Sequence, residues 1–117
     1  MNVLFEIEFY ALPDGRKPVE EFILNLPAKM QVKALDSLEI LEEKGTALRE
    51  PYSKSLGNGI FELRIRFASD ITRIFYFFYQ DRKIIVTNGY VKKSQKVPPG
   101  QLALAKRRKK DYEERRR

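Results

Sequence analysis

The sequence predicts an α+β fold: a small, mainly antiparallel sheet with two N-terminal helices on one face and a further helix at the C-terminus. Three consecutive segments joined by short turns carry alternating apolar residues or are apolar throughout, which is typical of antiparallel strands. Two segments before them and one after them repeat apolar residues at helical spacing. At 117 residues, with 43% hydrophobic residues, the chain is expected to form one domain over 1–117.

The expected order of elements is βααβββα. An N-terminal strand comes first because apolar and acidic residues alternate in it. Pro18 suits the first turn of a helix, Pro27 separates this helix from the next, and Gly45 ends the second one. The expected strands lie at 3–10, 60–67, 71–79 and 83–91, the expected helices at 18–26, 27–44 and 101–114, and a basic helical end covers 101–117.

The patterns also predict where these elements pack. The strand over 71–79 is apolar on both faces apart from Arg73, which favours a central position in the sheet. The segment 46–59 is rich in turn residues toward its end, and we expect it to be a connecting loop. The second helix is expected to face the core through one stripe, made by Val32, Leu35, Leu38 and Leu41.

Residue content limits the possible functions. The chain has no cysteine and no histidine, which removes disulfides, thiolate chemistry and the commonest general base and metal ligand. Residues 92–117 hold eleven Lys or Arg against three acidic residues, a net charge of +8, whereas residues 1–91 carry −1. A basic end on a near-neutral body predicts a polyanionic partner, with nucleic acid the first candidate. No signal peptide or membrane span is recognisable, so we expect a cytoplasmic protein without a membrane partner.

Arg73 is the most informative charged residue. A guanidinium inside an apolar strand is costly unless it has a partner or opens onto a water-filled cleft. It either binds phosphate or forms a structural ion pair, for instance with Glu62 on the neighbouring strand. Arg64 and Arg66 lie on the polar face of that strand, where they contact phosphate or are simply solvated.

Lys92 and Lys93 follow the last strand and complete a possible basic cluster with Arg73. Metal-free RNA cleavage must take a proton from the 2′-hydroxyl, stabilise the charged phosphorane and protonate the leaving 5′-oxygen. Arginines suit the second task, and a lysine among other cations suits proton transfer. The alternative for Lys92 and Lys93 is that they are ordinary surface lysines. The basic run at 106–110 is either a solvated helix end or a contact for ribosomal RNA.

Five segments carry a family resemblance: Glu-Pro-Tyr-Ser-Lys-Ser-Leu at 50–56, Gly-Ile-Phe-Glu-Leu-Arg at 59–64, Arg-Ile-Phe-Tyr at 73–76, Gly-Tyr-Val-Lys-Lys-Ser-Gln-Lys-Val-Pro-Pro at 89–99, and Asp-Tyr at 111–112. In this order and spacing they resemble the HigB-like, phage-derived branch of the RelE/ParE toxin superfamily. The likeness extends from about residue 18 to residue 112.

The resemblance implies a RelE-like fold and the toxin of a type II toxin–antitoxin pair. Such a toxin inhibits translation as a ribosome-dependent, metal-independent mRNA endoribonuclease, needs no cofactor, and has the ribosome, mRNA and a cognate antitoxin, a helix-turn-helix protein, as partners. It also implies Arg73, Lys92 and Lys93 as catalytic residues. The residues expected to bind RNA are Arg64, Arg66, Lys54, Lys96 and Tyr90.

Two alternatives stay open. One is a ParE-like toxin that acts on DNA gyrase and cuts no RNA, and the other is an inactive RNA-binding accessory protein. Some relatives use histidines near the site, which this chain lacks, so the resemblance leaves the general base open. Either Tyr90 or Tyr112 is a candidate to stack a base or to donate a proton.

Overall fold

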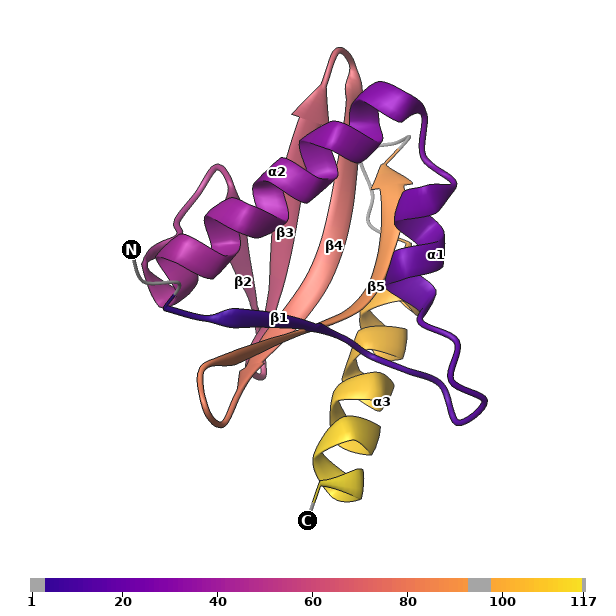
Figure 1. Ribbon diagram of the computed structural model, residues 1–117, viewed down its shortest axis with the longest axis vertical. Helices are drawn as coiled ribbons and strands as arrows, with labels where there is room; N and C mark the ends of the chain where they lie inside the picture. The colour runs from indigo at the N-terminus through magenta and orange to yellow at the C-terminus, as the bar shows by residue number, and fades with distance from the viewer. Residues whose placement is uncertain (1–3, 93–97, 117) are drawn as a thin grey trace.

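The computed structural model describes residues 4–92 and 98–116, so the predicted site residues Lys93 and Lys96 lie outside the described part of the chain. The fold is α+β, as predicted (Figure 1). In chain order the described elements are β1 (Glu6–Phe9), α1 (Pro18–Leu24), α2 (Ala28–Lys44), the short 3₁₀-helix η1 (Gly45–Ala47), β2 (Ser53–Gly57), β3 (Ile60–Phe67), β4 (Asp70–Tyr79), β5 (Lys83–Lys92) and α3 (Pro99–Arg115).

The strands form one sheet in the order β1-β5-β4-β3-β2. The four strands from β2 to β5 are antiparallel neighbours, whereas β1 runs parallel to β5 with Glu6 opposite Lys83. Strand β4 occupies the centre, which confirms the prediction from its apolar sequence. Strand β1 lies at an edge, in agreement with its half-apolar pattern.

Helices cover both faces of this sheet (Figure 1). Helices α1 and α2 pack on one face, where Ile74 of β4 belongs to the same core cluster as Leu38 of α2. Helix α3 packs on the other face, where the ring of Phe77 meets the ring of Tyr112 edge-on at 5.7 Å. Successive β4 residues therefore serve two cores, which explains why this strand is apolar throughout. Within the described ranges no helix has the length and apolarity needed to cross a membrane.

The stripe predicted for α2 is only half correct. Leu38 and Leu41 are buried, but Val32 is 59% exposed and Leu35 is 52% exposed. The buried positions in the first half of the helix are Met30 and Ala34 instead. At about 100° per residue these two lie on the side of Leu38 that faces the sheet, whereas Val32 is turned well away from it. The helix therefore presents apolar side chains to solvent.

The segment 46–59, expected to be a loop, contains strand β2 and the last two residues of the 3₁₀-helix η1, so that prediction was wrong for these residues. In the β2–β3 ladder Ser53 lies opposite Leu63 and Lys54 opposite Glu62. Backbone hydrogen bonds hold an edge strand, so its side chains need no apolar alternation. Ser53 is the buried residue of β2, and its hydroxyl lies 2.5 Å from the hydroxyl of Tyr76.

Gly89 of β5 leaves room for helix α1, and this makes its substitution a test of the packing. A Cβ at this position would lie 2.7 Å from the ring of Phe22 and 3.0 Å from the carbonyl oxygen of Arg73. We expect Gly89→Ala to lower the free energy of unfolding by about 1–3 kcal/mol through overpacking. Urea unfolding followed by circular dichroism measures the change.

Gly100→Ala is the matched control, because a Cβ there, in the first turn of α3, has no neighbour within 4 Å. It should leave stability unchanged or raise it by about 0.4–1 kcal/mol. Equal losses in the two variants would contradict the close packing of α1 on β5.

Candidate functional site

Charged side chains from three neighbouring strands meet on the sheet face that carries α3. Residues opposite each other in a ladder share a face. Arg64 of β3 lies opposite Arg73 of β4, which in turn lies opposite Tyr90 of β5. The next row is Arg66, Ile71 and Lys92. The three strands thus bring together five of the predicted site residues.

Arg73 forms the ion pair that was the alternative interpretation of its position. Its side chain is 7% exposed, and its Nη1 donates to Oε2 of Glu62, whose side chain is 1% exposed. Arg64 donates to the same oxygen through Nε at 3.0 Å, and its Nη1 lies 3.9 Å from Oε1 of Glu50. One buried carboxylate therefore holds two guanidinium groups. Glu62 is therefore part of the candidate site, together with Arg64 and Arg73.

Three polar atoms of this cluster are buried without a hydrogen-bond partner among the described residues: Nε of Arg73, Oε1 of Glu62 and the hydroxyl of Tyr90. Burial raises the pKa of the Tyr90 hydroxyl; the charge of Glu62 raises it further, and the charges of Arg73 and Arg64 oppose the shift. Tyr90 therefore stays protonated at neutral pH and remains a donor. A buried polar group without a partner costs about 1–3 kcal/mol, so these three atoms lower the stability of the fold.

The other predicted residues differ in accessibility. Arg66 is exposed, and Lys92 is half-buried at the end of β5. Lys54 is exposed on the edge strand β2, opposite Glu62 and on the same face as the arginines. Across residues 4–92 and 98–116 no three acidic side chains gather closely enough to hold a metal ion.

A cavity of about 330 Å³ lies beside β3 and reaches helix α2. Arg64, Arg66 and Arg73 line it together with Lys33 and with the exposed Tyr52. The sequence patterns did not point to Lys33 or Tyr52. Nothing in the period of α2 marks Lys33 as different from its other surface lysines, and Tyr52 lies in the segment read as a loop.

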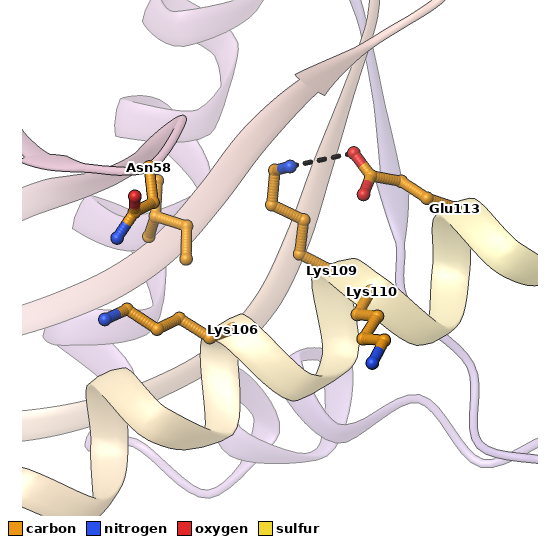
Figure 2. A pocket seen from close by; sticks show the side chains of 6 residues that line it. Asn58, Lys106, Lys109, Lys110 and Glu113 are labelled. Carbon is orange, nitrogen blue, oxygen red and sulfur yellow. Dashed lines mark hydrogen bonds and ion pairs between the residues drawn. The ribbon is translucent and has the colours of Figure 1, made fainter.

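A second basic surface lies on α3 next to the β2–β3 turn. Figure 2 shows the shallow pocket there, of about 250 Å³, with Asn58 on one side and Lys106, Lys109 and Lys110 on the other. Lys109 donates to Glu113 at 2.8 Å, whereas Lys106 and Lys110 are exposed and form no ion pair within the described residues.

Other cations of α3 fasten the helix to the sheet. Arg108 donates to the carbonyl oxygen of Thr87 at 2.7 Å, and Arg115 donates to that of Ala11 at 2.9 Å. The hydrogen bond from the Tyr10 hydroxyl and the neighbouring Arg115 hold the pKa of Asp111 below its usual range. The basic run at 106–110, interpreted from sequence as a solvated helix end or an RNA contact, therefore includes one structural anchor, Arg108, as well as free charges.

These features define a small α+β protein whose candidate site is a basic sheet face. The chain belongs to the family described as Phage derived protein Gp49-like (DUF891), whose model matches residues 21–110. The match includes α2, the strands β2 to β5 and the first part of α3, and hence all the predicted site residues. No curated protein matches the chain. The phage-derived, RelE-like class is confirmed, and the HigB-like branch stays a prediction.

The shared carboxylate predicts strong coupling between Arg73 and Glu62. Arg73→Met leaves a buried carboxylate with only the partly exposed Arg64 as partner, and should lower the free energy of unfolding by about 3–5 kcal/mol. Adding Glu62→Gln removes the uncompensated charge and should restore part of the loss. Urea unfolding of the wild type, both single variants and the double variant yields the coupling energy.

Arg66→Ala is the control for this cycle, because Arg66 is exposed and outside the ion pair, and it should change stability by less than about 0.5 kcal/mol. If the double variant lost the sum of the two single losses, the buried ion pair would be refuted.

Proposed function

We propose that the protein is the toxin of a type II toxin–antitoxin pair and that it cuts mRNA on the ribosome. One observation carries the proposal: Arg64, Arg66, Arg73 and Lys92 extend from three adjacent strands over one sheet face, and a buried carboxylate pairs with Arg64 and Arg73. Arginines bind phosphate oxygens through two parallel donors, so this face suits a phosphodiester. Membership of a RelE/toxin-like family supports the toxin class.

The proposed reaction joins the 2′-oxygen to phosphorus and breaks the bond from phosphorus to the 5′-oxygen. Negative charge builds up on the non-bridging oxygens in the transition state. Arg64 and Arg66 are the accessible guanidinium groups that contact these oxygens, and the buried Arg73 adds positive charge behind them. Glu62 is a positioning residue in this scheme, because its Oε2 holds both Arg64 and Arg73.

Protons move without histidine in this proposal, because the chain has none. Lys92, at the end of β5, and Lys93, the next residue in the sequence, are the proposed acid and base. Tyr90 keeps its proton because burial raises its pKa, so it is not the proposed base. The ribosome aligns the mRNA, and a cognate antitoxin, expected to be a helix-turn-helix protein, silences the enzyme.

A translation extract with a reporter mRNA tests the proposed nuclease. The wild type should cut the mRNA on ribosomes, and Arg64→Ala and Lys92→Ala should each lower the cleavage rate about 10²–10³-fold, as removal of one charge-stabilising donor does in other enzymes. Primer extension measures the cut sites and rates. Lys29→Ala is the control, because Lys29 is exposed at the start of α2 and does not line the site.

The same preparation distinguishes the alternatives. Intact mRNA together with blocked DNA supercoiling by gyrase would replace the nuclease with a ParE-like toxin. Intact mRNA with unaffected gyrase would leave the RNA-binding accessory protein.

We further propose that the free cations of α3 dock the protein on ribosomal RNA. The double variant Lys106→Glu, Lys110→Glu should bind ribosomes at least about 10-fold more weakly in 100 mM salt, since each phosphate contact contributes to salt-dependent affinity. Its urea midpoint should equal that of the wild type, because both side chains are exposed. Co-sedimentation with ribosomes measures the affinity.

Arg108→Ala separates anchoring from docking. It removes the donor to the Thr87 carbonyl and should lower the free energy of unfolding by about 1–3 kcal/mol. If the variant Lys106→Glu, Lys110→Glu bound ribosomes as tightly as the wild type, α3 would not be the surface that docks on ribosomal RNA.

A further inference from the structure

The cavity beside β3 combines two kinds of side chain. Four cationic residues line it, Lys33 from α2 and Arg64, Arg66 and Arg73 from the sheet, and no acidic residue does. The rest of the lining is mostly aromatic or aliphatic and includes Tyr52, Ile40 and Pro51. A flat apolar surface next to clustered positive charge matches a ligand that joins a flat ring to an anion.

Tyr52 is accessible and yet held in place. Its side chain is among the most exposed large apolar groups of the described chain, at 62%, and the nearby Ile40 is 46% exposed. The backbone N–H of Tyr52 donates to the Arg49 carbonyl at 3.0 Å, and its carbonyl accepts from the N–H of Arg64 at 2.9 Å. The second bond ties the Tyr52 backbone directly to β3. The ring is therefore attached to a fixed backbone one hydrogen bond away from an arginine of the site.

Tyr90, the aromatic residue expected to bind RNA, is placed differently. Its side chain is 8% exposed, and its ring lies 5.8 Å from that of Phe75 in the core beneath α3. A base cannot stack on a ring that is already covered on the protein side and buried from solvent. Tyr52 is the aromatic side chain with a free surface in the lining of the cavity.

We infer that this cavity binds a nucleobase of single-stranded RNA, stacked on Tyr52, with the adjoining phosphate on Arg64 and Arg66. Single-stranded RNA is commonly read by unstacked bases that lie on aromatic side chains, and such stacking tolerates any sequence. The cavity volume lies at the lower end of the range for small-ligand sites. The half-buried Ser37 in the lining supplies a hydroxyl for the edge of the base. The inference rests on the proposed function, because it names the substrate subsite of the same arginines.

The test compares intact and abasic RNA. Fluorescence anisotropy at low salt follows binding of a labelled five-nucleotide RNA and of five versions of it, each with one base removed. The wild type should bind the intact RNA about 5- to 150-fold more tightly than at least one abasic version, which is the range for stacking of one base. Tyr52→Ala should lose this difference and bind that abasic version as the wild type does, whereas Tyr52→Phe should keep the difference. Leu24→Ala is the control, because Leu24 is 66% exposed on α1 and outside the cavity.

Cleavage of mRNA by the same variants is measured separately in the translation extract. A base-dependent affinity that needs Tyr52, without any cleavage, would refute the nuclease and retain the base subsite. Cleavage without a base-dependent difference would refute the subsite and retain the nuclease. The inference is also overturned if the wild type binds none of the six RNAs, or if Tyr52→Ala binds all of them as the wild type does, as expected for a surface that contacts a protein partner.

Discussion

The buried ion pair between Arg73 and Glu62 constrains how this sheet is assembled. Removing a guanidinium and a carboxylate from water costs several kcal/mol for each ion, and the cost is offset only if the two groups meet with good geometry. They meet because β3 and β4 pair in one register, with Glu62 one row away from Arg73 on the same face. A slip by one residue would turn Glu62 into the opposite core and leave Arg73 alone. The same register places Arg64 and Tyr90 beside the pair.

The basic character of the chain divides into two structural uses. Arg108 and Arg115 donate to backbone carbonyl oxygens and hold α3 on the sheet, so some of their donors are used within the fold. Lys106 and Lys110 on the same helix are exposed and form no ion pair within the described residues. The net charge of +7 is unchanged by these bonds, but fewer guanidinium donors are free to bind a polyanion. What matters for recognition is which cations have no carboxylate or carbonyl oxygen nearby.

The sequence predicts the inner strands of this sheet better than the edge strand β2 and the buried side of helix α2. The alternation in β3 is preserved in the structure because each face of that strand has one environment, and β3 begins and ends where predicted. Helix α2 was placed correctly, but its buried side was misjudged because Val32 and Leu35 are apolar and yet exposed. Strand β2 was not predicted, because backbone hydrogen bonds hold it and its side chains show no apolar alternation. The ion pair of Arg73 with Glu62 was foreseen as one of two alternatives, whereas the position of the exposed Tyr52 beside the arginines depends on tertiary contacts that local patterns do not encode.

The parallel pairing of β1 with β5 joins the first strand of the chain to the last one. Contacts between such distant segments form late and slow the folding of small domains. During synthesis, β1 has no strand to pair with until β5 has been made. Tyr90 and Lys92 also belong to β5, so the same event completes the sheet and assembles the candidate site. A partly synthesised chain that ends before β5 consequently carries the arginines of β3 and β4 without the Tyr90 and Lys92 that complete the candidate site.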